Sequence, residues 1–196
     1  MLIPLQGEWT VEEYLKLDTN RLIEYTDGFL EFLPMPEEVH FFVQNFVFSA
    51  VEAFLRARGK GVACYAPFKV RIRAGAFREP DVCVLLDEND PRRARKYWGG
   101  ADMVIEVVSP GGEARDYLEK RDDYAGANIP EYWIVDPFKR ELLVLRLENG
   151  TYADHATLRP GDIAESAAMP GFRMDVSDCF AAAGRAAAND EPLSSA

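Results

Sequence analysis

The sequence predicts an α/β fold in which helices flank a central β-sheet. Continuous apolar runs occur at residues 81–86, 103–108 and 131–135, and runs of this length are typical of strands buried on both faces of a sheet. Apolar residues recur at helical spacing over residues 38–58, and a further helix is expected over 113–125. Strands and helices that alternate in this way favour helices packed against a shared sheet.

The N-terminal part is expected to form a short helix and then a hairpin. Thr10 and Glu13 form a capping box, in which each side chain satisfies a backbone N–H group of the first helical turn. Asp27-Gly28 joins two apolar-rich runs, residues 22–25 and 29–33. Asp-Gly between such runs is a strong hairpin signal.

The middle of the chain alternates strands with turn residues. The helix over 38–58 is expected to stop at Gly59 and Gly61, because glycine readily takes the left-handed conformation that closes a helix. Residues 69–73 are predicted to form a strand with Val70 and Ile72 facing inward and the basic residues facing outward.

The C-terminal part is expected to begin with a hairpin. Residues 142–147 and 151–156 would pair across Asn149-Gly150. After Pro160 the pattern is weaker, and it indicates a strand and a short helix near Phe180.

Residues 1–188 are expected to form a single domain, followed by a disordered tail over 189–196, where the residues are small and polar. No apolar stretch of about twenty residues is present, so no transmembrane helix is expected. The N-terminus lacks a basic region followed by an apolar run, so no secretory signal is expected. The cysteines contain no CxxC pair, which favours a reducing cytoplasm over a zinc ribbon or a disulfide framework. They are Cys64, Cys83 and Cys179.

The net charge of −11 counts against nucleic-acid binding, which usually shows a basic footprint. The charge is uneven, however, and an acidic protein with local basic patches is compatible with a phosphate-backbone partner. Each patch taken alone is more often a solvated surface. The patch on the strand at 69–73 shares one face and could contact a DNA backbone. The patches are Arg56, Arg58 and Lys60; Lys69, Arg71 and Arg73; and Arg92, Arg93, Arg95 and Lys96.

Buried carboxylates are the main functional signal. Glu106 lies inside an aliphatic run, where a lone carboxylate is costly to bury unless it stays protonated. Asp81 opens the preceding apolar strand, directly after Pro80. Two strands that each present an acid predict a hard-cation site, because Mg²⁺ prefers a few carboxylates completed by water and phosphate oxygens. The structural alternative is that Asp81 lies in solvent and Glu106 pairs with a lysine or arginine.

A lysine on the next helix is the third candidate. Asp116, Lys120 and Tyr124 are spaced four apart, so they share one helix face. If this helix packs against the sheet, Lys120 can point toward the two acids. The alternative is an ordinary ion pair between Asp116 and Lys120 on a solvated face.

Several strings of residues, taken together, resemble the Uma-type restriction-endonuclease family, a large bacterial family within the PD-(D/E)XK nuclease superfamily. The resemblance covers about residues 10–180. The strings are Pro80-Asp81-Val82, Val104 to Pro110, Asp116 to Lys120, Tyr124-Ala125, Glu131 to Pro137 and, nearer the N-terminus, Thr10 to Tyr14, Glu24, Asp27-Gly28, Glu31, Met35-Pro36 and His40.

The resemblance implies a mixed sheet flanked by helices, with the acids at a splayed sheet edge. It implies that Asp81 and Glu106 bind a divalent metal, Mg²⁺ or Mn²⁺, and that the backbone carbonyl of Val107 completes the site. The lysine that the superfamily pattern expects two residues after the acid is replaced by Val108. The family pattern moves this lysine onto the following helix, where Lys120 matches it.

Three further residues match the family pattern less specifically. Glu24 matches a family acid and is taken as a fourth catalytic candidate. Glu31 and His40 also match, but they fit equally well as a hairpin acid and a helix-start residue.

These features predict a Mg²⁺-dependent endonuclease that hydrolyses phosphodiester bonds of DNA in the cytoplasm, with Asp81, Glu106, Lys120 and Glu24 in its active site. Lys120 would position or deprotonate the attacking water. A homodimer would allow two copies to cut two strands.

Three alternatives remain open. The first is a non-catalytic module of the same fold that binds nucleic acid or a protein partner, which the acidic charge supports. The second is a structural protein, which predicts a lysine or arginine bonded directly to Glu106. The third is a small-molecule enzyme that uses the same carboxylates and metal.

Overall fold

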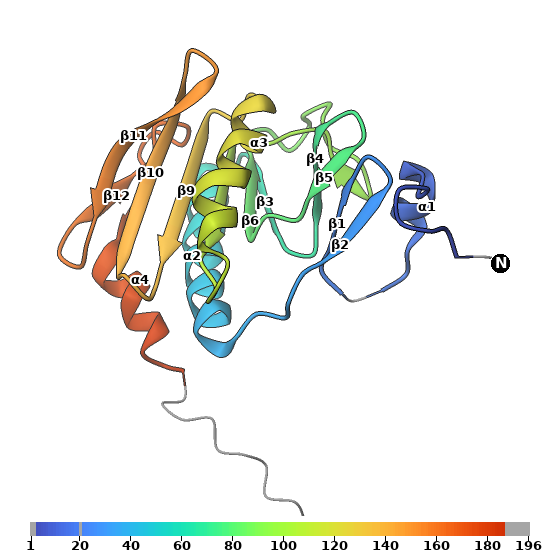
Figure 1. The fold of residues 1–196 in the computed structure, drawn as a ribbon. Helices are drawn as coiled ribbons and strands as arrows, with labels where there is room; N and C mark the ends of the chain where they lie inside the picture. Colours follow the sequence, from blue (N-terminus) through green and yellow to red (C-terminus); the bar gives the residue numbers. More distant parts are fainter. Residues whose placement is uncertain (1–2, 20, 187–196) are drawn as a thin grey trace, which may run out of the picture.

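The computed structural model describes residues 3–19 and 21–186, and Figure 1 shows their arrangement. The tail expected over 189–196 lies outside the described residues. The elements are α1 (Val11–Lys16), β1 (Ile23–Thr26), β2 (Phe29–Phe32), α2 (Glu38–Arg58), β3 (Val62–Tyr65), β4 (Lys69–Arg73), β5 (Ala76–Arg78), β6 (Val82–Leu85), β7 (Tyr97–Trp98), β8 (Met103–Val107), the π-helical turn η1 (Arg115–Glu119), α3 (Lys120–Gly126), β9 (Glu131–Asp136), β10 (Glu141–Glu148), β11 (Thr151–Leu158), β12 (Ile163–Glu165), β13 (Arg173–Asp175) and α4 (Val176–Ala183).

The main sheet is mixed and has six strands in the order β11-β10-β9-β8-β6-β3. Strands β8 and β9 run parallel, and the other neighbours are antiparallel. The connection from β8 to β9 carries η1 and α3, as a parallel pair requires a crossover. A second sheet, in the order β2-β1-β5-β4-β7, lies beside the first. This arrangement confirms the predicted α/β fold with a mixed sheet flanked by helices.

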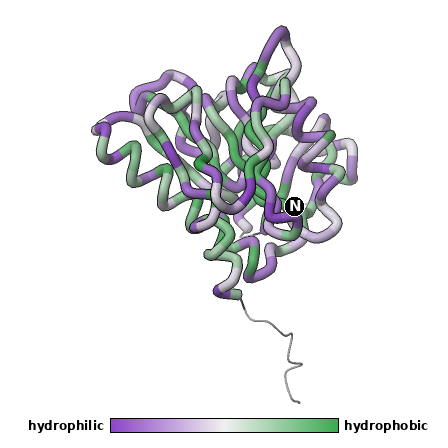
Figure 2. The backbone as a smooth tube through the Cα atoms, turned by 90° about the vertical axis from the view of Figure 1, so that its left-hand side faces the viewer, coloured by the Kyte–Doolittle hydropathy of each residue, from purple (hydrophilic) through white to green (hydrophobic). Residues whose placement is uncertain are grey.

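Helices cover both faces of the main sheet (Figure 1). On one face α2 packs Val43, Val47 and Val51, spaced four apart, against β6 and β8. On the opposite face α3 packs Tyr124 and Ala125 against other residues of the same strands. Figure 2 shows the hydrophobic segments running through the middle of the molecule, between more polar outer loops. Alternate residues of β8 therefore belong to two different hydrophobic cores, one beneath α2 and one beneath α3.

The predicted turns and the long helix are confirmed. Asp27 and Gly28 have φ values of 47° and 92°, and Asn149 and Gly150 have 51° and 84°. Two consecutive positive φ values match the tight hairpin turns that Asp-Gly and Asn-Gly favour. Helix α2 spans the predicted residues 38–58 and ends at Gly59, which is left-handed with φ 62°.

The strand at 69–73 confirms one prediction and corrects another. Val70 and Ile72 are buried as expected. Lys69, however, does not face solvent, because its ammonium lies 3.0 Å from Glu79 and above the ring of Tyr14. A buried carboxylate in the neighbouring segment attracts the ammonium inward. None of the described helices combines the length and the apolar character that crossing a membrane would require.

Candidate active site

Asp81, Glu106 and Lys120 come from three separate elements and meet at one place. Asp81 directly precedes β6, Glu106 lies in β8, and Lys120 stands where η1 passes into α3. The Lys120 ammonium lies 2.9 Å from Oε2 of Glu106, and the backbone N–H of Asp81 donates to the same oxygen at 3.3 Å. All three residues are at most 9% exposed. The structure therefore brings together the three residues on which the sequence argument depended.

Strand register explains how the two carboxylates become neighbours. In the antiparallel pair β6–β8, Val82 stands opposite Ile105. Asp81 and Glu106, one position further along each strand, are therefore adjacent. Ile105 and Val107 point into the core beneath α2, so Glu106 points to the other face, toward α3. Because side chains alternate between the two faces of a strand, Glu106 points toward the helix that carries Lys120.

The π-helical turn η1 and the residue after it carry three charged side chains of the site, Arg115, Asp116 and Lys120. The backbone N–H of Lys120 donates to the carbonyl of Arg115, five residues earlier, which is the π-helical pattern. Asp116 lies 2.9 Å from the Lys120 ammonium through its Oδ1. The ion pair between Asp116 and Lys120 therefore exists, but it is buried and it adds to the contact with Glu106.

A histidine of α2 holds the Asp81 carboxylate from the other side. Nε2 of His40 lies 3.0 Å from Oδ2 of Asp81, and the N–H of Val107 donates to the same oxygen at 2.7 Å. Gln44, one turn later on α2, donates to the backbone carbonyl of Asp81 at 3.0 Å. Among the described residues, no hydrogen bond reaches Oδ1 of Asp81. One oxygen of Asp81 is therefore fixed and the other is available for a ligand.

The cluster gathers three carboxyl groups around one buried ammonium. Burial raises the pKa of Glu106 to about 8, against the opposing effect of Lys120 and with the support of Asp81 and Asp116. Burial also raises the pKa of Asp116. Burial opposes ionisation of Asp81, but His40 and Lys120 outweigh it and lower the Asp81 pKa. An added cation would favour the ionised form of all three carboxyl groups.

Glu24, the fourth catalytic candidate, occupies a different position. Its side chain is fully buried in β1 and accepts a hydrogen bond from Arg78 at 2.8 Å and another from Arg115. The N–H of Glu79 donates to its second oxygen at 3.2 Å. Glu24 therefore holds two guanidinium groups, and it is not among the residues that line the cavity described next.

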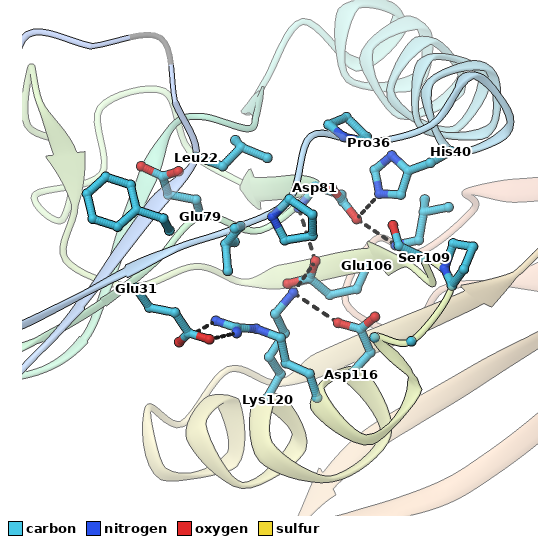
Figure 3. A pocket seen from close by; sticks show the side chains of 18 residues that line it. Leu22, Glu31, Pro36, His40, Glu79, Asp81, Glu106, Ser109, Asp116 and Lys120 are labelled. Carbon is cyan, nitrogen blue, oxygen red and sulfur yellow. Dashed lines mark hydrogen bonds and ion pairs between the residues drawn. The ribbon is translucent and has the colours of Figure 1, made fainter. Parts of the chain in front are cut away.

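A cavity of about 280 Å³ opens beside the cluster (Figure 3). In Figure 3, the Lys120 ammonium lies between Glu106 and Asp116, Asp81 and His40 lie beyond Glu106, and Glu31 reaches toward the helix from the side. Its walls come from the second sheet, the start of α2, the main sheet and the loop before η1. The lining residues are Leu22, Glu31, Phe32, Leu33, Pro34, Pro36, His40, Glu79, Asp81, Glu106, Val107, Ser109, Pro110, Gly111, Gly112, Arg115, Asp116 and Lys120.

Comparison with known proteins places the chain in a family. A family model described as "Uma2: Putative restriction endonuclease" matches residues 11–177. The chain belongs to the Uma2 family. The description of this family supports a nuclease-type function. No protein with a curated description matches the chain.

A solved structure shares the fold of this Uma2 chain. It is described as a "putative nuclease belonging to DUF820" from Anabaena variabilis ATCC 29413. The two chains superpose with a TM-score of 0.71 and are 18% identical, and the match covers 92% of this chain and 99% of the other. At this identity the comparison establishes the fold.

The donor groups of the Uma2 chain suit a hard divalent cation. Asp81 and Glu106, with the backbone of Val107, line one wall of the cavity, and carboxylate and carbonyl oxygens are the ligands that Mg²⁺ prefers. Within the described residues, no three His, Cys, Asp or Glu side chains form a ready-made metal cage. Mg²⁺ commonly binds through one or two carboxylates together with water and substrate phosphate oxygens, so a cage is not required.

Arg115, which lines the cavity, could not be found from the sequence. Arg115 stands five residues before Lys120, which on an ideal α-helix would place it on a different face. Only the π-helical turn brings it to the cavity, and nothing in the sequence indicates such a turn. Arg78, in β5, does not line the cavity, but it bridges Asp123 and Glu24, and Glu24 in turn binds Arg115.

Proposed function

We propose that this protein is a metal-dependent endonuclease that hydrolyses phosphodiester bonds of DNA. The observation that carries the proposal is the convergence of Asp81, Glu106 and Lys120 from three elements beside one cavity. A buried group of carboxylates and a lysine in a cavity is a candidate hydrolytic site, and the family's description favours a nucleic acid as the substrate.

Asp81, Glu106 and the backbone carbonyl of Val107 would hold the metal. Bound there, Mg²⁺ or Mn²⁺ would supply Lewis-acid stabilisation of the phosphate and a water of lowered pKa. The chain's own residues keep this wall in place: His40 and the Val107 N–H fix Oδ2 of Asp81, and Tyr124 donates to Oε1 of Glu106.

Lys120 would act on the attacking water and on the charge of the phosphate. Burial alone would lower its pKa, but Glu106 and Asp116 outweigh burial and raise it. The ammonium is therefore charged in the free protein, and it is held at 2.9 Å by both carboxylates. A charged lysine fixed in this way suits stabilisation of developing phosphate charge and positioning of water better than proton abstraction.

The decisive experiment is cleavage by the purified protein and matched variants. Supercoiled plasmid, single-stranded DNA and RNA are incubated with Mg²⁺ or Mn²⁺, and nicked or shortened products are separated on gels. Asp81→Asn and Lys120→Met should lower the cleavage rate at least about a hundredfold, as expected when electrostatic stabilisation of the transition state is removed.

Asp154→Asn is the matched control, because Asp154 is an exposed carboxylate paired with Arg121 away from the cavity. It should cleave like the unaltered protein. Cleavage that persists unchanged in Asp81→Asn or Lys120→Met would contradict the assignment of the site.

A non-catalytic module of the same fold is the second candidate. Lys120 is bonded directly to Glu106, which is what a purely structural role for the acid predicts. The net charge of −11 also favours a protein that does not bind DNA strongly on its own. Failure to cleave any of the three nucleic acids with either metal, in a protein that still binds Mn²⁺, would favour this candidate.

A further inference from the structure

A second group of charges adjoins the three-residue cluster and has no role in the proposed chemistry. Arg115 lines the same cavity as Asp81 and Lys120, and its guanidinium is held by two glutamates. Glu24 binds it from the interior. Glu31 binds it from the rim, with one of its two contacts at 3.0 Å. The two glutamates differ in burial, and this difference suggests different roles.

Glu24 is a permanent anchor. Its side chain is fully buried, and it is bonded to Arg78 and to the N–H of Glu79 as well as to Arg115. Arg78 is held in turn by Asp123 at 2.8 Å. Breaking this network would leave a buried charge uncompensated, so the guanidinium of Arg115 is fixed in position whether or not Glu31 is present.

Glu31 is a replaceable partner. It lies in β2, at the edge of the second sheet, and its side chain is 54% exposed. Exposed ion pairs contribute little to stability, because water competes with both partners. Figure 3 shows Glu31 reaching across the side of the cavity toward the helix that carries Lys120. A competing anion could therefore take its place without disturbing the fold.

Arg115 also has a donor without an acceptor. Its Nε is buried and forms no hydrogen bond to any described residue. Buried N–H groups almost always have a partner, and a guanidinium fork matches two phosphate oxygens as well as it matches a carboxylate. The two guanidinium nitrogens that Glu31 holds from the rim suit a tetrahedral anion that enters the cavity, and the unpartnered Nε leaves the guanidinium short of one acceptor.

We propose that Arg115 binds a phosphate group of the nucleic-acid backbone next to the bond that is cut, and that Glu31 occupies this phosphate position in the free protein. The proposal rests on the proposed nuclease function for the identity of the ligand. It adds a backbone-binding residue and a carboxylate that competes with the substrate for it.

The test measures binding without cleavage, so that it is independent of catalysis. Fluorescently labelled single-stranded and duplex oligonucleotides are titrated with the full chain in EDTA at low ionic strength, and anisotropy gives Kd. Glu31→Gln should bind about three- to tenfold more tightly, because the guanidinium loses its competing anion. Arg115→Ala should bind about tenfold more weakly and reduce the slope of log Kd against log salt by about one.

The matched controls are the two members of an ion pair between α3 and β11. Arg121 pairs with Asp154, which is 59% exposed, away from the cavity. Arg121→Ala and Asp154→Asn therefore remove the same kinds of charge without touching the proposed phosphate position. Both should change Kd less than about twofold, as expected for isolated surface charges outside the contact area.

The outcomes separate this proposal from the nuclease assignment. Glu31→Gln alters no buried group, so it tests the proposal even if Arg115→Ala fails to fold. If Glu31→Gln binds no more tightly than the unaltered protein, in either form of the oligonucleotide, the proposal is wrong. If the binding series holds but no cleavage occurs with any metal, the nuclease assignment fails and the phosphate position stands.

Discussion

Lys120 and Glu106 depend on each other, because neither can be removed alone without leaving the other buried. Both are at most 6% exposed. Glu106 has partners for both carboxylate oxygens, Tyr124 on one and Lys120 on the other. Loss of one member of a buried pair costs more than loss of both, since the remaining charge is then uncompensated.

The mutual dependence of Lys120 and Glu106 should appear when the stability of the metal-free protein is measured in EDTA at different pH values. Between its ordinary pKa of 4.5 and its raised pKa of about 8, Glu106 keeps a proton in the folded protein that the unfolded chain releases. The free energy of unfolding therefore falls as pH rises through this window. In Lys120→Met the opposing charge is gone, so the Glu106 pKa rises further and the fall continues above pH 8.

The expected result is that the stability deficit of Lys120→Met grows by about 1–2 kcal/mol between about pH 7 and 9.5. Urea denaturation at both pH values measures it. The double variant Lys120→Met/Glu106→Gln should show no such growth, and neither should Lys16→Met, which removes an exposed ion pair with Glu12. A deficit that is equal at both pH values would contradict the buried pairing.

The sequence revealed the acids of the site better than it revealed their partners. Glu106 stood out because aliphatic neighbours leave a carboxylate no ordinary packing role. His40 was left between a structural and a functional role, because its contact with Asp81 joins residues 41 positions apart. Arg115 was missed, since its place at the cavity depends on a helix irregularity.

Strand β9 carries a buried glutamate, Glu131, that fixes a loop distant in sequence. Oε1 of Glu131 accepts from the indole N–H of Trp133 at 2.7 Å, and Oε2 accepts from the backbone N–H groups of Ala167 and Ala168 at 2.8 and 2.9 Å. Because β9 is the parallel neighbour of β8, this clamp ties the loop to the strand next to Glu106.

Replacing Glu131 by Gln should destabilise the fold by about 1–3 kcal/mol, because an amide NH₂ would face a backbone or indole N–H and leave it without an acceptor. Urea or thermal unfolding measures the loss. Glu148→Gln, at the exposed end of β10, should stay within about 0.5 kcal/mol of the unaltered protein. Equal stabilities for the two variants would show that the clamp does not contribute.

Element prediction succeeded where the pattern was long or the turn chemistry strong. Helix α2 and the two hairpin turns follow from helical spacing and from Asp-Gly and Asn-Gly. Strands β3, β5 and β7 were not predicted, because they have four, three and two residues and little periodicity to detect. Their place is set by pairing with neighbours distant in sequence, which local patterns do not encode.

In the molecule as a whole, the basic patch expected to contact DNA, on the strand at 69–73, is largely neutralised within the protein. Lys69 lies 3.0 Å from Glu79, and Arg73 pairs with Asp27 at 2.7 Å. Of the three basic residues of this strand, Arg71 alone has no carboxylate partner among the described residues. With a net charge of −11, long-range attraction to DNA is therefore expected to be weak.

A protein of this charge should need a divalent cation to hold DNA tightly. Ca²⁺ binds oxygen ligands and bears the same charge as Mg²⁺, so it can bridge the site carboxylates and a backbone phosphate. In anisotropy titrations at about 150 mM salt, replacing EDTA by Ca²⁺ should tighten binding at least about tenfold, because a bridging cation adds charge-assisted contacts. Asp81→Asn should lose this gain, whereas Asp154→Asn should keep it. Binding that is already tight in EDTA, and unaffected by Ca²⁺ or by Asp81→Asn, would mean that the acids at β6 and β8 do not face the nucleic acid at all.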